Sequence, residues 1–445
     1  MKKIFNSYWI RSGFYTLGGK IFEAAFGLLS FFFLIRTLDK PEFGVWALFM
    51  TVSGLTESLR NAFVYNPLIR FINTHEDADH AKIIAASIVQ NGLFTLVSSG
   101  LIFLLAPYAA QIWDAPSIIM PLHIFCLSNV VLAVFAQFNF IQQAYLQFKG
   151  MFYSFLFRRG LFFAFALYCY IDYREVALEA LASSHLIILL LSLPIGYFFS
   201  RQFIKIHFKA VKLWLGKLVG FGKFTVGTNL TSVLFTNIDA WMLGSLISTK
   251  AVASYNPAVK VLTLIEVPVG SLMTVSYPQM TRKIKEQGAS AARQIYEKSV
   301  SFIIALMIPL TILVIIFSDL IVTLIAGNEY QEAGPILQIT ALFGLFIPFN
   351  RQFGVVMNAL GKAHINLRFV LANLVVSVVA NYFFISAYGV IGAALGTLTT
   401  YFLSFVYGQL FLFFHLKIKT SNILIDIFKF YRNPVRSVKE NLKRS

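Results

Sequence analysis

Charged residues are scarce in this chain. Asp, Glu, Lys and Arg make up only 13% of its 445 residues, whereas 58% are hydrophobic. This composition excludes an ordinary soluble domain, in which about a quarter of the residues are charged. It is typical of a protein that crosses a membrane many times.

Cysteine is scarcer still, with two residues in the whole chain. Cys126 and Cys169 both lie in apolar stretches, where a thiol usually packs as a small hydrophobic side chain. Two isolated cysteines argue against a disulfide framework and against a paired-cysteine metal site. We therefore expect no bound metal.

The sequence also lacks the motifs of common catalytic sites. It has no GxxxxGK[ST] loop, which argues against built-in ATP hydrolysis, and no HExxH or GxSxG motif. Its seven histidines are scattered along the chain. We therefore expect neither an enzyme nor a resident cofactor.

Acidic residues are outnumbered by basic ones, 20 against 37, which leaves a net charge of +17. Such a charge can indicate nucleic-acid binding. The basic residues, however, gather in short segments between apolar runs, a distribution typical of the cytoplasmic face of a membrane protein. We expect membrane lipids as partners and no nucleic acid.

Long apolar runs dominate what the chain does contain. A membrane-spanning helix needs about 20 mostly apolar residues, and runs of this kind recur twelve times. We predict spans at residues 12–35, 43–69, 81–107, 118–143, 150–171, 177–200, 218–247, 252–280, 299–325, 333–360, 363–386 and 390–415. The chain is thus predicted to be an all-α polytopic membrane protein.

The loops between these spans differ in basic residues from one side to the other. Loops on the side opposite to the N-terminus carry only Arg36, Lys40, Arg174 and Lys250, whereas all other loop lysines and arginines lie on the N-terminal side. Basic loops stay in the cytoplasm. The bias therefore predicts that both termini are cytoplasmic.

The two halves of the chain resemble each other weakly at an offset of about 210 residues, as expected of two repeats in parallel orientation. For example, FNFIQQAYLQFKG aligns with FNRQFGVVMNALG. We predict a six-helix lobe at 1–200, a basic cytoplasmic linker at 201–217, a second six-helix lobe at 218–415 and a basic amphipathic tail at 416–445. This organisation favours a two-lobed transporter over a membrane scaffold.

Ionisable residues inside the predicted spans are candidates for function, because a charge at mid-bilayer costs about 2.5–3.5 kcal/mol or more. Apart from Lys223 near a helix start, the bases are Lys20, Arg60, Arg158, Arg159, Lys260 and Arg351. The acids are Glu23, Glu57, Asp239 and Glu266. Since bases outnumber acids, we predict a basic cavity for an anionic substrate, in which arginine suits phosphate oxygens.

Some of these charges have a partner within one helical turn. Lys20 and Glu23 are three residues apart, as are Glu57 and Arg60, so each pair shares a helix face. Structural pairing and a functional role are equally compatible with that spacing.

Arg158 and Arg159, in YSFLFRRGLFFAF, have no acid within a turn, and Arg351 also lacks one. Adjacent helical residues point about 100° apart. We therefore expect one of the two neighbouring arginines to reach the lipid headgroups and the other to face the cavity. Which one does which is not decided by the sequence.

Several stretches together resemble the polysaccharide and O-antigen flippases of the multidrug/oligosaccharidyl-lipid/polysaccharide exporter superfamily. They are GGKIFEAAFGLLSFFFLIRTLDKPEFGVWALFMTV (18–52), FGKFTVGTNLTSVLFTNIDAWMLGSLIS (221–248), YPQMTR (277–282), MNALGKAHINLR (357–368) and YGVIGAALGT (388–397). They occur in the expected order over the whole chain.

This resemblance implies a MATE-like fold with two pseudo-symmetric six-helix lobes around a central cavity, working by alternating access. It implies movement of an undecaprenyl-diphosphate-linked oligosaccharide from the cytoplasmic to the periplasmic leaflet of the bacterial inner membrane. A polysaccharide polymerase and a chain-length regulator are the implied protein partners. The six bases are then candidates for head-group binding, and the four acids for H⁺ or Na⁺ coupling or for charge balance.

Two other functions remain open at this point. An ion-coupled multidrug exporter of the same superfamily would share the fold, but its cavity is expected to be acidic or aromatic. A membrane glycan polymerase would be an enzyme with catalytic residues in a large outer loop, whereas the outer connections here are short.

Overall fold

The computed structural model describes residues 8–172, 176–287 and 290–432, and the regular elements in this part of the chain are all helical. Helices occupy all twelve ranges that the sequence predicts to be spans. The first half contains α2 (Tyr8–Thr37), α3 (Lys40–Arg60), the π-helical turn η1 (Asn61–Tyr65), α4 (Asn66–Thr74), α5 (Asp77–Ile112), the 3-10 turn η2 (Pro116–Ile118), α6 (Ile119–Ala144), α7 (Phe148–Ile171) and α8 (Leu178–Ser200).

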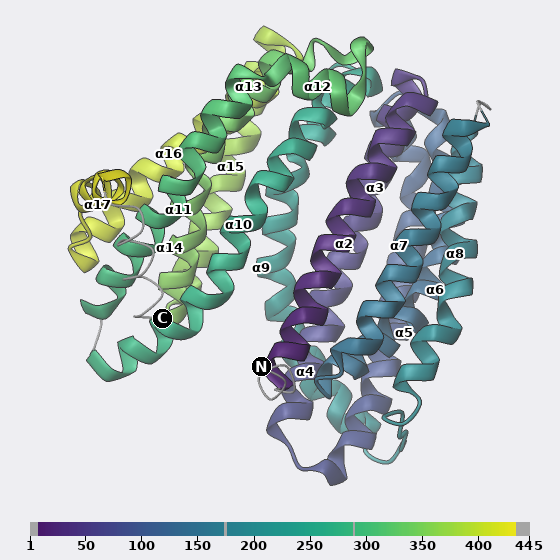
Figure 1. Cartoon of the computed structure of the whole chain (residues 1–445). Helices are drawn as coiled ribbons and strands as arrows, with labels where there is room; N and C mark the ends of the chain where they lie inside the picture. Colours follow the sequence, from purple (N-terminus) through teal and green to yellow (C-terminus); the bar gives the residue numbers. More distant parts are fainter. Residues whose placement is uncertain (1–7, 173–175, 288–289, 433–445) are drawn as a thin grey trace. The chain divides into compact units, whose positions relative to one another are not determined.

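The second half is likewise a series of helices (Figure 1). It contains α9 (Val211–Leu246), α10 (Thr249–Gln287), α11 (Ser290–Ile316), α12 (Ser318–Ala326), the 3-10 turn η3 (Asn328–Tyr330), α13 (Ala333–Gly344), α14 (Ile347–Ala359), α15 (Ala363–Tyr388), α16 (Val390–Leu416) and α17 (Thr420–Arg432).

Eight helical segments within the described residues are long and apolar enough to cross a membrane. They lie at Asp77–Ile112, Pro116–Ala144, Phe148–Ile171, Leu178–Ser200, Ala292–Ile316, Ala333–Ala359, Ala363–Tyr388 and Val390–Leu416. The remaining predicted ranges coincide with α2, with α3 to α4, with α9 and with α10. The all-α polytopic class is confirmed, and the number of twelve spans stays a prediction.

The chain divides into two compact units. Unit 1 consists of Met1–Val233 and Ser248–Ala253, and unit 2 of Leu234–Ile247 and Ser254–Ser445. Both α9 and α10 therefore contribute to both units. The predicted boundaries of the lobes, the linker and the tail stay predictions. The two compact units do not distinguish membrane-spanning lobes from a linker or a tail.

In unit 1, α2 packs along α7, and α6 packs between α5 and α8 (Figure 1). One core cluster joins α4, α5 and α6 to the start of α9, where Trp214 is 4% exposed and Leu218 is fully buried. The predicted linker thus ends in a segment whose apolar residues are packed into unit 1.

Local sequence explains how α3 begins and ends. Asp39 accepts a hydrogen bond from the Glu42 amide at 2.8 Å, and Pro41 follows in the first turn, a combination that starts a helix well. At the other end the backbone widens into η1, where the Asn66 amide bonds to the Asn61 carbonyl. Such π-turns are rare and often lie at functional positions.

In unit 2, α15 packs along α16 and α13 packs against α16. Gly392 and Gly396 of GVIGAALG lie directly against the backbone of α15 at the first of these contacts. A Cβ on Gly392 would lie 2.0 Å from the Phe384 carbonyl oxygen, so only glycine fits there.

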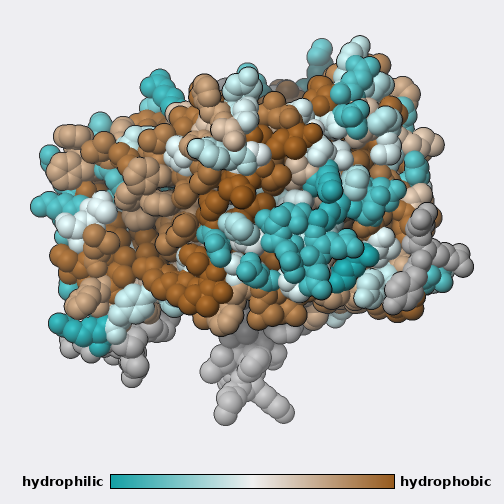
Figure 2. Space-filling view, turned by 90° about the horizontal axis from the view of Figure 1, so that it is seen from above, coloured by the Kyte–Doolittle hydropathy of each residue, from teal (hydrophilic) through white to brown (hydrophobic). Residues whose placement is uncertain are grey.

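Large apolar side chains cover much of the molecular surface, as Figure 2 shows for one face. Leu96 and Leu104 on α5 are 73% and 67% exposed, and Phe383 on α15 is 65% exposed. Helices that carry such side chains outward require a lipid environment. The chain is therefore a multi-pass membrane protein.

Candidate functional site

Two neighbouring arginines of α7 pair with carboxylates from two other helices of unit 1. The Arg158 Nη1 lies 3.7 Å from the Glu57 Oε1 on α3. The Arg159 Nη2 donates to the Glu23 Oε1 on α2 at 2.9 Å. Neither arginine has an acid within a turn of its own helix, but each finds one on another helix.

The two arginines differ in burial as well as in partner. The Arg158 side chain is 11% exposed and that of Arg159 is 30% exposed. The angle of about 100° between adjacent helical residues explains why they meet different helices. Both line a small recess together with Phe162, His185 and Ile188, between α7 and α8.

Arg60 is the most deeply buried of the predicted bases within the described side chains, at 1% exposure. Its Nη2 donates to the Asn129 Oδ1 at 2.6 Å, the Asn129 carbonyl at 3.1 Å and the Thr95 Oγ1 at 3.3 Å. In the described structure its Nε and Nη1 have no hydrogen-bond partner. The predicted Glu57–Arg60 ion pair does not form, because the Glu57 carboxylate meets Arg158 instead.

The other predicted bases have different surroundings. The side chain of Lys20 lies outside the described residues, so its predicted pairing with Glu23 is untested, while Glu23 itself binds Arg159. Lys260 is partly buried on α10 and has an interaction partner.

Arg351 also has a partner that the sequence does not reveal. Its Nη2 on α14 donates to the Glu266 Oε2 on α10 at 3.1 Å, within unit 2. The two side chains are 48% and 28% exposed. Three predicted acids, Glu23, Glu57 and Glu266, thus each hold one predicted arginine.

Asp239 on α9 differs from those acids, because its partners are neutral. Its Oδ2 accepts from the Tyr255 hydroxyl on α10 and from the Thr397 hydroxyl on α16, and its Oδ1 accepts from the Asn381 amide on α15, each at 2.8 Å. No described cation forms an ion pair with it.

These three donors were not predicted, since they come from three helices and no local spacing links them. The Asn381 Oδ1 is buried and has no hydrogen-bond partner in the described structure. An acceptor left unsatisfied beside a carboxylate suits a bound cation or water. No group of three or more His, Cys, Asp or Glu among the described residues is arranged to hold a metal ion.

Comparison with known proteins identifies the family of the chain. The family model described as "Polysaccharide biosynthesis protein" matches residues 33–335. A probable low-salt glycan biosynthesis flippase, Agl15 of Haloferax volcanii, is 22% identical over 180 residues, which are 40% of this chain and 38% of that protein. The matches to curated relatives cover between 29% and 53% of those proteins' lengths.

Two solved structures share the fold over nearly the whole chain. The lipid II flippase MurJ in an inward closed conformation has a TM-score of 0.71 at 14% identity, covering 94% of this chain and 92% of MurJ. An inward-facing multidrug resistance MATE transporter of the MOP superfamily has a TM-score of 0.74 at 13% identity, covering 87% and 94%. The predicted MATE-like fold is confirmed, and the chain belongs to the polysaccharide biosynthesis protein family.

Proposed function

We propose that the chain is a flippase for an undecaprenyl-diphosphate-linked oligosaccharide, which it moves from the cytoplasmic to the periplasmic leaflet by alternating access. Membership of a polysaccharide biosynthesis family carries this proposal. A relative named as a glycan flippase and the fold shared with a lipid II flippase support it. In bacteria this function belongs in the inner membrane, and a polymerase and a chain-length regulator would use the product.

The ion pairs of Arg158, Arg159 and Arg351 suggest how an anionic head group is bound. Each guanidinium is held by one carboxylate, which keeps it oriented. A diphosphate has more oxygen acceptors than one carboxylate and suits the planar fork of arginine. We infer that the diphosphate displaces Glu57, Glu23 or Glu266 when it binds and that the carboxylate returns on release.

Fewer observations support the other three predicted bases as contacts of the diphosphate. Arg60 has two nitrogens without a hydrogen bond but is fully enclosed, so it would reach a substrate only after a rearrangement of unit 1. Lys20 and Lys260 stay proposed contacts on the basis of their position in the predicted spans.

The membrane potential favours the proposed direction. An inside-negative potential contributes about 2.3 kcal/mol per charge per 100 mV to the outward movement of an anion. The cytoplasmic placement of both termini, which the distribution of loop bases predicts, sets which side is inward.

Asp239 is the proposed site of H⁺ or Na⁺ coupling. Its carboxylate, the hydroxyl of Thr397 and the unsatisfied Asn381 Oδ1 are hard oxygen ligands gathered from three helices. A cation bound there would join α9, α15 and α16, so its binding and release are suited to changing their packing.

Transport by the purified protein in liposomes tests the proposed function. The substrate is a fluorescent undecaprenyl-diphosphate-linked oligosaccharide, and its outer-leaflet fraction is read with an added reagent that destroys the dye. We expect the wild-type chain to speed flipping and Arg158→Gln or Arg159→Gln to slow it at least about tenfold, because each removes a charge-assisted phosphate contact.

Arg201→Gln is the matched control, since Arg201 lies outside the predicted spans with its guanidinium over the Phe198 ring. It should flip at the wild-type rate. Wild-type liposomes that flip no faster than empty ones would refute the flippase proposal. Tight binding of an organic cation without binding of the lipid diphosphate would favour the multidrug exporter, whose fold the chain shares.

A further inference from the structure

The short helix α17 follows the last predicted span and is packed against unit 2. Ile423 is fully buried and Ile427 is 8% exposed, and both belong to a core cluster with residues of α11 and α14. The Tyr431 hydroxyl donates to the Ala305 carbonyl on α11 at 2.6 Å. One face of α17 is therefore fixed to the membrane domain.

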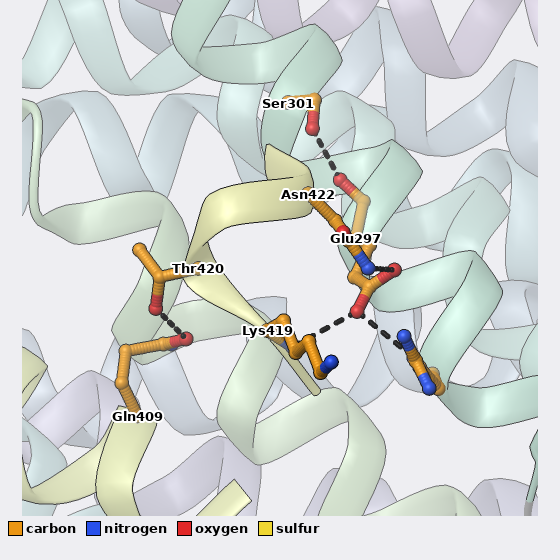
Figure 3. A network of polar contacts seen from close by, with 7 residues as sticks. Glu297, Ser301, Gln409, Lys419, Thr420 and Asn422 are labelled. Atoms are coloured by element: carbon orange, nitrogen blue, oxygen red, sulfur yellow. Dashed lines mark hydrogen bonds and ion pairs between the residues drawn. The ribbon is translucent and has the colours of Figure 1, made fainter. Parts of the chain in front are cut away.

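A buried carboxylate of α11 fixes the start of this helix (Figure 3). Glu297 is 8% exposed and accepts from the Lys419 amide and from the Asn422 Nδ2, both at 3.0 Å. Arg293 donates from Nε to the same carboxylate at 3.0 Å. A negative group at a helix N-terminus compensates the unpaired amides and the helix dipole.

The opposite face of α17 remains apolar although it is not packed against the protein. Leu424 is 62% exposed, Ile425 51% and Phe428 69%. A helix that only had to pack on α11 would carry polar residues there. The exposed apolar surface continues on the last turns of α16, where Phe414 is 67% exposed.

Basic residues border this apolar face. Lys419, Lys429 and Arg432 are exposed, whereas the one acid of α17, Asp426, is neutralised by Lys429 at 3.1 Å. The sequence after the helix, NPVRSVKENLKRS, is also basic. An apolar helix face edged with lysine and arginine matches a bilayer surface that contains anionic lipids.

We propose that α17 binds the cytoplasmic surface of the bilayer, with Leu424 and Phe428 inserted at the level of the headgroups and Lys429 and Arg432 selecting anionic phospholipids. The hydrogen bonds from Lys419 and Asn422 to the Glu297 carboxylate hold the helix in this position. This contact is independent of the transported substrate. One face of α17 binds the protein and the other binds lipid.

Site-specific quenching in nanodiscs tests this contact in the full-length chain. In a Cys126→Ser/Cys169→Ser background, bimane is attached at Phe428→Cys or at the exposed control position Glu329→Cys. The nanodiscs contain phosphatidylcholine with brominated acyl chains, with or without phosphatidylglycerol. We expect quenching at position 428 at least about twice that at 329, as for a side chain at the headgroup boundary.

Phosphatidylglycerol should increase the quenching at position 428, and Lys429→Gln/Arg432→Gln should remove that increase, whereas Lys362→Gln should not. Equal quenching at 428 and 329 in both lipids would overturn the proposal. So would a dimer whose formation shields position 428 in detergent, because α17 would then bind a second copy.

A measurement on the unmodified chain guards against labelled variants that misfold. Hydrogen exchange of the α17 amides should slow in nanodiscs containing phosphatidylglycerol relative to pure phosphatidylcholine, while exchange in η3 stays constant. Equal exchange of α17 in the two lipids would contradict the selection of anionic lipid.

Discussion

Arg159 and Glu23 form an ion pair of 2.9 Å between α7 and α2, while the preceding residue, Arg158, is held by Glu57 of α3 at 3.7 Å. One step along α7 thus changes the partner helix. Two charges that are adjacent in sequence bind α7 to two neighbours, and each can be removed on its own.

The burial of the arginine, more than the N···O distance, should decide how much each ion pair contributes to the free energy of unfolding. Glu57→Gln leaves the Arg158 side chain, which is only 11% exposed, without its carboxylate. We expect a loss of about 1–3 kcal/mol, below the figure for a fully buried pair because Glu57 itself is 40% exposed. Glu23→Gln should cost less than about 1 kcal/mol, because Glu23 is 47% exposed. Thermal unfolding in detergent measures both, and the reverse order would contradict this account.

The Asn129 side chain should be needed to keep Arg60 inside unit 1. Asn129→Leu removes the 2.6 Å bond to a guanidinium that already has two unsatisfied nitrogens. We expect a loss of about 3 kcal/mol, since the charge is left buried with little compensation. Asn139→Leu is the control: Asn139, also buried on α6, donates only to the Phe135 carbonyl of its own helix. Asn129 also donates to the Ser98 and Ser99 hydroxyls, so Ser98→Ala/Ser99→Ala measures the share of the loss that is independent of Arg60. Equal melting temperatures for the two variants would argue against this role.

Sodium should stabilise the protein through Asp239 if Na⁺ is the coupling ion. A cation at 100 times its dissociation constant adds about 2.7 kcal/mol to the folded state. We expect the melting temperature of the wild type to rise in NaCl relative to choline chloride of equal concentration, and that of Asp239→Asn to stay constant. If the melting temperature of the wild type responds to pH but not to sodium, and Asp239→Asn loses that response, the proton is the coupling ion. Unchanged transport by Asp239→Asn would exclude coupling at this residue.

Two glycines of α3 should respond in opposite ways to alanine. A Cβ on Gly44 would lie 1.9 Å from the Thr249 carbonyl oxygen, within unit 1. Gly44→Ala is therefore expected to cost about 1–3 kcal/mol by overpacking. Around Gly54 nothing lies within 4 Å of the added atom, so Gly54→Ala should be neutral or stabilising by up to about 1 kcal/mol through helix propensity. Thermal unfolding of both variants, followed by circular dichroism, measures the two changes in stability and so separates the effect of overpacking from that of helix propensity.

Much of the fold could be predicted, because hydrophobic runs of sufficient length leave helices as the only solution in lipid. The predicted range 333–360 illustrates the limit: it is helical, but as α13 and α14 with a break after Gly344. Likewise, the range 43–69 contains η1, for which the hydrophobic pattern has no signal.

The charged partners could not be predicted, since the spacing rule used for them holds only within one helix. It correctly identified Glu57 as a residue in need of a cation but assigned Arg60, three residues away, in place of Arg158 on another helix. The same limit applies to Arg351 and Glu266. The positions of the charged residues within the spans can be read from the sequence, whereas their pairing depends on how α2, α3, α7, α10 and α14 pack.

The π-turn η1 is the point at which the helix from α3 to α4 can absorb a change in its number of residues. It accommodates an additional residue relative to an α-helical turn. Loss of one residue between Asn61 and Tyr65 would therefore restore the regular turn and leave the rotation of α4 relative to α3 nearly unchanged. Loss of one residue from the regular turns of α3, in contrast, would rotate α4 by about 100°. Leu68 and Ile72, now buried beside Trp214, would then be carried away from that core.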